Sequence, residues 1–556
     1  MFLFAAGETS NTSGKRCFSL FAVALVVGGS LWDSLHHVAK VRHNPDVLDA
    51  AFLELVFPEI AQQHRVTART PLIEATMQNI FQALPKNGRG TLGGAALRTL
   101  LHRFFLNSRG YVLKGLEPGG VLWNGSVSVD LLSEGVPKDA RELLDSRLHE
   151  HGSSLADSAL LASLVLEMVL AEERKVLTDV YESLGMSLQD ALGDSGARKV
   201  LNLFSQGLVF GGSIKELAEW DVDQETLTEI YSAWPEVLTF VGELHRSVVS
   251  DQSVVTFDDM LSVVWAIHER FGQWQNRECN QVKDQLYRLH GGRTGRVLIS
   301  DFYGGRVLDE QWPFLESGGY LRQLGALDVE HTLEPRVIVP NYMYSLSNCV
   351  TMREHFSICC LDACESILAS VEMALGSPRG LPEDIIDVVS GSSVVESWTN
   401  LVFSGSLRQR LYDVAASHGG LVPIHGRLFR QWLHHAYPLE CAFPHMSGTV
   451  RPLTEEDYVL ETGVDPRASV EEIFQRIDDA TPRWRREKLE VEDLESVLWI
   501  AEEETLDTSE VQTCDQICHV FQFLVLAVAG ACGYWMSVAI GQSHSGNYFE
   551  TKKHYV

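Results

Sequence analysis

The feature that most constrains this chain is an uncharged apolar run over residues 521–540, which reads FQFLVLAVAGACGYWMSVAI. Only Gln522 and Ser537 in this run are clearly polar. About 20 apolar residues in a helix span the hydrocarbon core of a bilayer, so the run from Phe521 to Ile540 predicts a transmembrane helix. A buried core helix is the alternative. The polar tail that follows disfavours a GPI signal, because the hydrophobic part of such a signal ends the chain.

A second apolar segment, residues 17–32, follows the basic pair Lys15 and Arg16. Its strongest part, residues 18–27, has the length of the apolar region of a secretory signal peptide, and small residues at 28–30 suit a cleavage site. The segment is short for a bilayer crossing. A signal peptide is therefore the favoured interpretation, with a signal anchor or a buried helix as alternatives.

The charges that flank the two segments agree on an orientation. The basic pair before the first segment holds the N-terminus inside, and Lys552 and Lys553 after the second segment place the tail inside. Residues 501–519 contain no Lys or Arg. Residues 33–518 are then expected in a lumen or outside the cell, where Asn124, in an Asn-Gly-Ser sequon, is a glycosylation candidate.

The composition of the chain narrows the function further. A length of 556 residues predicts several folded units rather than one core. The formal net charge of -29 argues against a nucleic-acid-binding surface, which requires concentrated Lys and Arg. An acidic surface instead attracts cations or basic partners.

Half of the 10 cysteines cluster in one third of the chain: Cys349, Cys359, Cys360, Cys364 and Cys441. In an oxidising compartment some of them are expected to pair, whereas in a reducing one they are expected to be buried thiols. The targeting signals favour the first alternative.

Helical periodicity dominates the body of the chain, and the expected fold class is mainly α. Helices are expected over residues 157–184, 227–244, 260–271, 279–289 and 470–477. Short strands are expected over residues 336–339 and 253–257. Strands and helices do not alternate, so a doubly wound sheet is not expected.

A helix–loop–helix pattern recurs along the chain. In residues 285–303 a helix leads into a glycine-rich turn, a short apolar run and an acidic residue. If Gly295 is the sixth loop position, Val297 is the eighth and Asp301 the twelfth. The loop that begins at Val248 has Val255 eighth and Asp259 twelfth, at a spacing that suits pairing with the first loop.

A third frame begins at Pro85, with Gly90 sixth, Leu92 eighth and Ala96 twelfth. Looser copies occur at residues 152–160 and 418–429. These frames resemble the EF-hand superfamily in degenerate form, and the overall layout looks like that of large uncharacterised protist membrane proteins. The resemblance implies paired helix–loop–helix modules.

The resemblance does not extend to the loop positions that would bind calcium. A calcium loop requires oxygen ligands at its first, third, fifth and twelfth positions. The loop at Pro85 places Asn87, Arg89 and Ala96 at the last three of these positions, and the other two loops have only Asp259 or Asp301 as a carboxylate. We therefore expect the fold without the metal, and calcium is not supported as a cofactor.

On this basis the expected units are a signal peptide or signal anchor (1–32), a helical EF-hand-like module (33–118), a helical module (119–222), a degenerate EF-hand-like pair (223–310), a Cys/His-rich mixed module (311–450), an acidic helical stalk (451–517), the transmembrane helix (519–541) and a short cytosolic tail (542–556).

Residues 418–445 are rich in groups that bind zinc, which accepts imidazole and thiolate ligands. The weak candidates are His418, His425, His434, His435, Cys441 and His445. No second ligand pair has a standard spacing, and packing of aromatic and histidine side chains is the alternative. A cysteine nucleophile near His355 is a further weak possibility.

The leading hypothesis is a membrane-anchored, non-catalytic interaction or structural protein that presents acidic, groove-like surfaces to helical or basic protein partners. No catalytic motif is recognisable, and neither an enzymatic activity nor a cofactor is expected. The alternatives are a weak calcium sensor and a lumenal metal- or thiol-dependent enzyme that uses residues 418–445.

Overall fold

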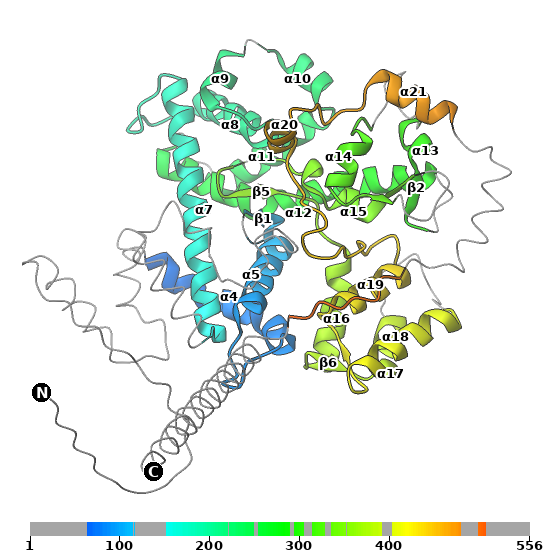
Figure 1. Cartoon of the computed structure of the whole chain (residues 1–556). Coiled ribbons are helices and arrows are strands. Elements are labelled where there is room, and N and C mark those ends of the chain that lie inside the picture. Colours follow the sequence, from blue (N-terminus) through cyan, green and yellow to red (C-terminus); the bar gives the residue numbers. More distant parts are fainter. Residues whose placement is uncertain are drawn as a thin grey trace, which may run out of the picture.

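The computed structural model describes residues 64–114, 116, 152–220, 222–249, 254–289, 294–304, 314–328, 335–351, 353–391, 403–479 and 499–506. Over these residues the fold is mainly helical, as expected, with short strands between helices (Figure 1). Among the described helices none combines the length and apolar character that a bilayer crossing requires. The expected segments at residues 17–32 and 521–540 lie outside the described residues, as does Asn124.

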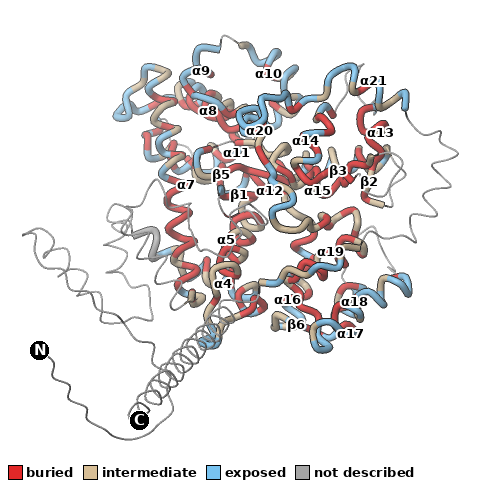
Figure 2. Tube along the Cα trace, viewed as in Figure 1, coloured by how far each residue is buried: buried red, intermediate tan, exposed pale blue. Residues whose placement is uncertain are grey.

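Three hydrophobic cores organise the described residues. The first core buries side chains between Ile73 and Phe271, together with Phe356 and Ile358. Its helices are α4 (His64–Ala83), α5 (Gly94–Arg109), α7 (Leu155–Ser183), α8 (Asp194–Val209), α9 (Ile214–Glu219), α10 (Gln224–Ile230), α11 (Trp234–Val249) and the first half of α12 (Phe257–Leu289). The long helix α7 packs along α4, and much of α7 is buried (Figures 1 and 2). This core draws on four of the units expected from the sequence.

The second and third cores are formed mainly by described residues that follow the middle of α12. The second consists of α16 (Cys364–Leu375), β6 (Arg379–Gly380), α17 (Pro382–Gly391), α18 (Gly405–Ser417), β7 (Val422–Pro423) and α19 (Arg427–Ala436). The third contains β2 (Arg296–Leu298), α13 (Ile299–Gly304), α14 (Gly318–Gln323), β3 (Leu327–Asp328), β4 (Arg336–Ile338), α15 (Val339–Met343), α20 (Glu455–Thr462) and α21 (Val470–Asp478). The short helix η3 (Leu346–Asn348) follows α15.

Helix α12 links two of the cores. Met260 and Phe271 lie in the first core, whereas Cys279 and Leu286 lie in the third. Two separate helices were expected here, and a single helix is observed. At the crossing with the end of α5, Gly272 is required, because a Cβ atom there would lie 2.1 Å from the carbonyl oxygen of Arg109.

Short antiparallel pairings join loops that precede helices. Leu92 pairs with Ser153, Leu192 with Val255, and Val297 with Val337, and each of these residues stands two positions before a helix begins. Strand β6 also pairs antiparallel with β7, with Gly380 opposite Val422, although Val422 stands five positions before α19. Strand β3 extends the β2–β4 pair, and β1 (Tyr111–Leu113) pairs with β5 (Phe356–Ile358). The loops of the described chain are therefore organised in pairs.

The expected pairing of the loop of Val255 with that of Val297 is wrong. Val255 pairs with Leu192 and Val297 with Val337. The physical reason is the length of α12, whose 33 residues separate the two loops at opposite ends of one rod. The loop before α8, which was not recognised in the sequence, is the actual partner of Val255.

Other local expectations have mixed outcomes. The helices expected at 157–184 and 470–477 are observed as α7 and α21, and the strand at 336–339 is observed as β4. The helix expected at 227–244 is divided into α10 and α11, because Pro235 at the second position of α11 favours a helix start. Of the described residues in the strand expected at 253–257, only Val255 forms a bridge, and Phe257 begins α12.

A charged group lies sealed inside the first core. Arg353 Nε donates to Glu173 Oε1 at 2.8 Å, and His268 Nε2 lies 2.9 Å from Glu173 Oε2. Arg353 also donates to the Gly207 carbonyl. Burial alone would raise the pKa of Glu173, but His268 and Arg353 outweigh it and hold that pKa at about 2. We call these three residues, Glu173, His268 and Arg353, the sealed cluster.

Candidate functional site

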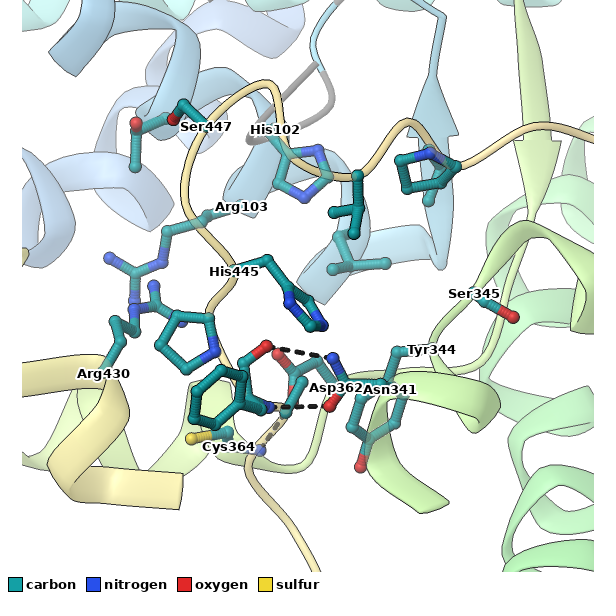
Figure 3. A pocket seen from close by; sticks show the side chains of 18 of the residues that line it. His102, Arg103, Asn341, Tyr344, Ser345, Asp362, Cys364, Arg430, His445 and Ser447 are labelled. Atoms are coloured by element: carbon teal, nitrogen blue, oxygen red, sulfur yellow. Dashed lines mark hydrogen bonds between the residues drawn. The ribbon is translucent and has the colours of Figure 1, made fainter. Parts of the chain in front are cut away.

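A cavity of about 640 Å³ lies where the three cores meet. Its lining includes Leu116 of the first core, Cys364 of the second and Leu453 of the third. Side chains reach it from α5, from the turn after α15, from α19 and from residues 442–453 (Figure 3). A volume of this size is typical of pockets for small organic molecules.

One wall of the cavity is a network of ion pairs. Arg103 on α5 donates to Glu365 and to Glu372 on α16, with Arg103 Nη2 3.0 Å from Glu372 Oε2. Both Nη atoms of Arg430 on α19 lie 3.1 Å from Glu365 Oε1. His425 Nε2 lies 2.7 Å from Glu372 Oε1. We call Arg103, Glu365, Glu372, His425 and Arg430 the cavity cluster, and it joins three helices.

The arginines keep the two glutamates ionised. Burial alone would raise the pKa of Glu365, but Arg103 and Arg430 outweigh it and hold that pKa at about 2. Burial opposes ionisation of Glu372 as well, but Arg103 and the hydrogen bond with His425 keep its pKa below the usual value. Both glutamates therefore carry negative charge at neutral pH.

Two further titratable groups line the cavity with shifted pKa values. Burial lowers the pKa of His102 to about 4, so its imidazole is neutral at physiological pH. Burial and the nearby Glu365 carboxylate raise the pKa of Asp362 to about 7. Figure 3 shows His102 and Asp362 among the labelled side chains around the same space. Titratable groups with shifted pKa values that line one cavity indicate a candidate functional site.

Residues 499–506, from the expected acidic stalk, pack beside the cavity, and Glu504, Thr505 and Leu506 line it. Arg427 donates through Nε to the Glu502 carbonyl at 2.9 Å, and its main-chain N–H donates to the Glu504 carbonyl at 2.9 Å. Glu503 Oε1 accepts from the Leu428 N–H, at the first turn of α19. This part of the chain is packed on the body, and none of its residues is helical.

Three disulfides surround the cavity. They join Cys279 to Cys360, Cys349 to Cys359, and Cys364 to Cys441. The expectation that the cysteine cluster pairs is therefore confirmed for all five of its members, and Cys279 is the sixth partner. Every cysteine among the described residues is in a disulfide.

The structure uses the predicted zinc candidates in other ways. His425 contacts Glu372, and His434 Nδ1 lies 2.7 Å from the Cys441 carbonyl oxygen. Burial lowers the pKa of His434 well below its usual value. Cys441 has no thiolate to offer a metal, because its sulfur is bonded to Cys364.

The other three histidines are dispersed. His418 Nδ1 lies 2.8 Å from the Val414 carbonyl oxygen, and His445 Nε2 lies 2.7 Å from the Gly325 carbonyl oxygen. The ring of His435 contacts those of its aromatic neighbours. Over the described ranges, no three or more His, Cys, Asp or Glu side chains are arranged to hold an ion. The contacts observed for these histidines are those of the packing alternative.

The two acids of the degenerate loops lie at the starts of helices. Asp259 Oδ2 accepts from the main-chain N–H and the hydroxyl of Thr256, which closes the first turn of α12. These hydrogen bonds lower the pKa of Asp259. Asp301 lies in the first turn of α13.

The residues of the cavity cluster, apart from His425, were not recognised in the sequence. Arg103 and Glu365 are separated by 262 residues, and single charged residues are usually solvated on the surface. One signal was present, because Glu365 and Glu372 are seven residues apart and share a face of α16. Comparison with protein-family models, curated proteins and solved structures finds no match to this chain.

Proposed function

We propose that this chain is a membrane-anchored, non-catalytic interaction protein, whose body is built from paired, calcium-free helix–loop–helix units of the EF-hand type. The body is acidic and faces a lumen or the cell exterior. Its protein partners are helical or basic, in keeping with the formal net charge of -29.

The geometry of the paired loops supports this proposal. In an EF-hand pair, the eighth loop residues of the two hands form an antiparallel contact, as Leu92 and Ser153 do here, and as Leu192 and Val255 do. The sixth position takes a glycine for a sharp turn. Gly90 and Gly295 occupy that position, and both have a positive φ, at 80° and 66°.

The observation that carries the calcium-free assignment is the use of the twelfth-position acids as helix caps. Asp157, four residues after the paired Ser153, forms a capping box with Ser154. Asp259 forms the corresponding bonds with Thr256. Carboxylates are sparse at the other ligand positions: the loop of Ser153 has Glu150 at position five, and the loop of Val337 has Glu330 and Glu334 at positions one and five. In the loop of Leu192, positions one, three, five and twelve are Gly185, Ser187, Gln189 and Gly196. In the loop of Val422 the same positions are Ala415, Ser417, Gly419 and Gly426.

The cysteines support the proposed location. Structural disulfides persist in oxidising compartments and are rare in the cytosol. Two of the three pairs, with separations of 81 and 77 residues, join distant parts of the fold. This agrees with translocation of residues 33–518, which the flanking charges predict.

The thiol and imidazole groups that the enzyme alternatives require have other partners in the structure. A thiol nucleophile near His355 would have to come from Cys349, Cys359 or Cys360, and all three are in disulfides. Of the zinc candidates, four histidines contact carbonyl oxygens or a carboxylate, and Cys441 is bonded to another cysteine. A non-catalytic function therefore accounts for these residues more simply.

Calcium titration of the full-length protein tests the proposal. We expect neither measurable heat in calorimetry nor a shift of the thermal unfolding midpoint between calcium and a chelator. Calcium-dependent stabilisation would favour the weak calcium sensor, and stoichiometric zinc in metal analysis would favour the enzyme.

Restoring the ligands of one loop tests the assigned frame itself. The combined variant Pro85→Asp, Arg89→Asp, Ala96→Glu would supply carboxylates at positions one, five and twelve, while Asn87 already supplies an amide oxygen at position three. We expect this variant to bind calcium, whereas Ala96→Glu alone does not. A folded triple variant that ignores calcium would contradict the frame.

The membrane anchor is tested separately. Alkaline carbonate should leave the full-length protein in the membrane pellet, because a spanning helix resists extraction. Glycosidase treatment should increase gel mobility only if Asn124 is translocated. Release of the protein by carbonate would contradict the membrane anchor, and the proposed function would then need revision for a soluble protein.

A further inference from the structure

The cavity at the junction of the three cores carries an inference that goes beyond protein interaction. We infer that it binds a small organic carboxylate with an apolar body, whose carboxylate contacts Arg430 beside His102. Four observations support this assignment, namely the charge of the lining, the accessibility of Arg430, the state of His102 and the division of the wall into polar and apolar parts.

The charge of the cavity lining is opposite to that of the chain. Among the described residues that line the cavity, arginines outnumber carboxylates. The arginines are Arg98, Arg103, Arg427, Arg430 and Arg451, and the carboxylates are Asp362, Glu365 and Glu504. In a chain with a net charge of -29, a cationic concave site concentrates the field for an anion.

One arginine of the cavity cluster is placed to meet a ligand. The side chain of Arg103 is 2 % exposed and is enclosed by its two glutamates. The side chain of Arg430 is 28 % exposed, and both of its Nη atoms share a single oxygen of Glu365. A guanidinium has five N–H donors in a planar fork that matches a carboxylate. Arg430 therefore has donors to offer.

His102 supplies a second polar contact. Its Nδ1 atom is buried and has no hydrogen-bond partner among the described residues. Burial keeps the imidazole neutral, because its pKa is lowered to about 4. A neutral imidazole donates one hydrogen bond and accepts another. A ligand that contacts His102 would satisfy a polar group whose burial is otherwise unfavourable.

The lining also has an apolar part. It includes Leu106, Val112, Met446, Val450 and Leu453. In β1, Tyr111 and Leu113 are buried in the first core, so Val112 is the residue of this strand that faces the cavity. A ligand whose hydrocarbon chain contacts these apolar side chains and whose carboxylate contacts Arg430 would match both the apolar and the polar part of the lining.

Other ligand classes fit less well. A metal ion lacks a cluster of ligands over the described ranges. A phosphate group would favour an open helix N-terminus, but at α19 the Glu503 carboxylate already accepts from the Leu428 N–H. The planar guanidinium of Arg430 matches the geometry of a carboxylate.

The test uses three probes of equal length that differ in charge: hexanoate, hexylammonium and hexan-1-ol. Calorimetry on the full-length protein is expected to show that hexanoate binds at least about tenfold more tightly than hexylammonium, as a charge-assisted hydrogen bond predicts. Equal affinity, or tighter binding of hexylammonium, would overturn the inference. Inorganic phosphate as a fourth probe shows whether the apolar body is needed, and phosphate binding as tight as that of hexanoate would also overturn it.

Two variants locate the binding. Arg430→Gln should reduce hexanoate affinity about tenfold and leave that of hexan-1-ol unchanged, which also shows that the cavity remains intact. Val112→Trp should fill the apolar part and weaken hexanoate and hexan-1-ol alike. The matched control is Arg408→Gln, which removes an exposed arginine from α18 and should leave all affinities unchanged. Hexanoate affinity that survives both Arg430→Gln and Val112→Trp places its site elsewhere and refutes the assignment.

Discussion

Two buried charged clusters differ in what lies beside them. In the sealed cluster, Glu173, His268 and Arg353 are enclosed by the first core, and each side chain is at most 6 % exposed. In the cavity cluster, Arg103 is equally buried, but Arg430 borders an open space of about 640 Å³. Both clusters join segments that are distant in sequence. Burial of an ion pair is therefore common to both clusters, and what differs is the open space that borders Arg430.

The sharpest way to break this comparison is to remove the central carboxylate of the sealed cluster. Glu173→Gln leaves the Arg353 guanidinium buried without its counter-charge, so we expect the free energy of unfolding to fall by about 3–5 kcal/mol. Urea denaturation followed by circular dichroism measures it. Glu182→Gln, at an exposed position of the same helix, is the control. A loss below about 1 kcal/mol would mean that this cluster is not sealed.

The disulfide beside the cavity gives the next largest effect. Cys364→Ala combined with Cys441→Ala opens a loop of 77 residues, and we expect the free energy of unfolding to fall by about 2–4 kcal/mol. Hydrogen exchange should increase in α16 and α19 and remain unchanged around Glu173. The pair Cys349→Ala and Cys359→Ala, which closes only 10 residues, should cost less. Equal losses in both double variants would contradict this ordering.

The matched substitution in the cavity cluster should have a smaller effect than that in the sealed cluster. In Glu372→Gln, Arg103 retains Glu365, so we expect a fall of about 1–2 kcal/mol in the free energy of unfolding. The same denaturation experiment applies. If this variant is as unstable as Glu173→Gln, the distinction between the two clusters disappears.

The smallest effect concerns the pH dependence of stability. Asp362 faces Glu365, Arg430, Lys283 and the Tyr344 hydroxyl, which accepts from the Ala363 N–H. Its pKa is raised to about 7, so the folded state holds a proton that the unfolded state has released. Its contribution to stability is therefore present below the unfolded pKa and is lost as pH rises towards 7.

Asp362→Asn should remove this pH dependence. Between pH 5 and pH 8, we expect the stability of the variant to rise relative to that of the unmodified protein by on the order of 1 kcal/mol. Thermal unfolding at a series of pH values measures the difference. Parallel pH profiles for the two proteins would show that Asp362 is ionised throughout, as a group in open solvent would be.

How much of the fold follows from sequence depends on the range of the interaction. Helix α7 is predicted by its own apolar periodicity, because a helix face is a local property. The continuity of α12 is not predicted in this way, because the mostly polar residues 272–278 interrupt the apolar pattern between its two halves. The frames of individual loops are also local. Their partners are set by tertiary packing, so the pairing of Val255 with Leu192 was not predicted.

The candidate site illustrates the same division. The cysteine cluster was recognised because its members are close in sequence, but Cys279 was not, since 81 residues separate it from Cys360. The histidines near residue 430 suggested a metal, yet their ring nitrogens contact carbonyl oxygens and a carboxylate. Burial of Arg103 and Glu365 depends on the meeting of α5 and α16, which no local pattern indicates.

The shared helix α12 has a consequence for how the protein unfolds. Its first half contributes Met260 and Phe271 to one core, and its second half contributes Cys279 and Leu286 to another. Loss of either core removes the tertiary support of half the helix, and partial helices of this length are marginal in water. The two cores should therefore melt in a single cooperative transition, and a protease should find no stable fragment that ends near Gly272.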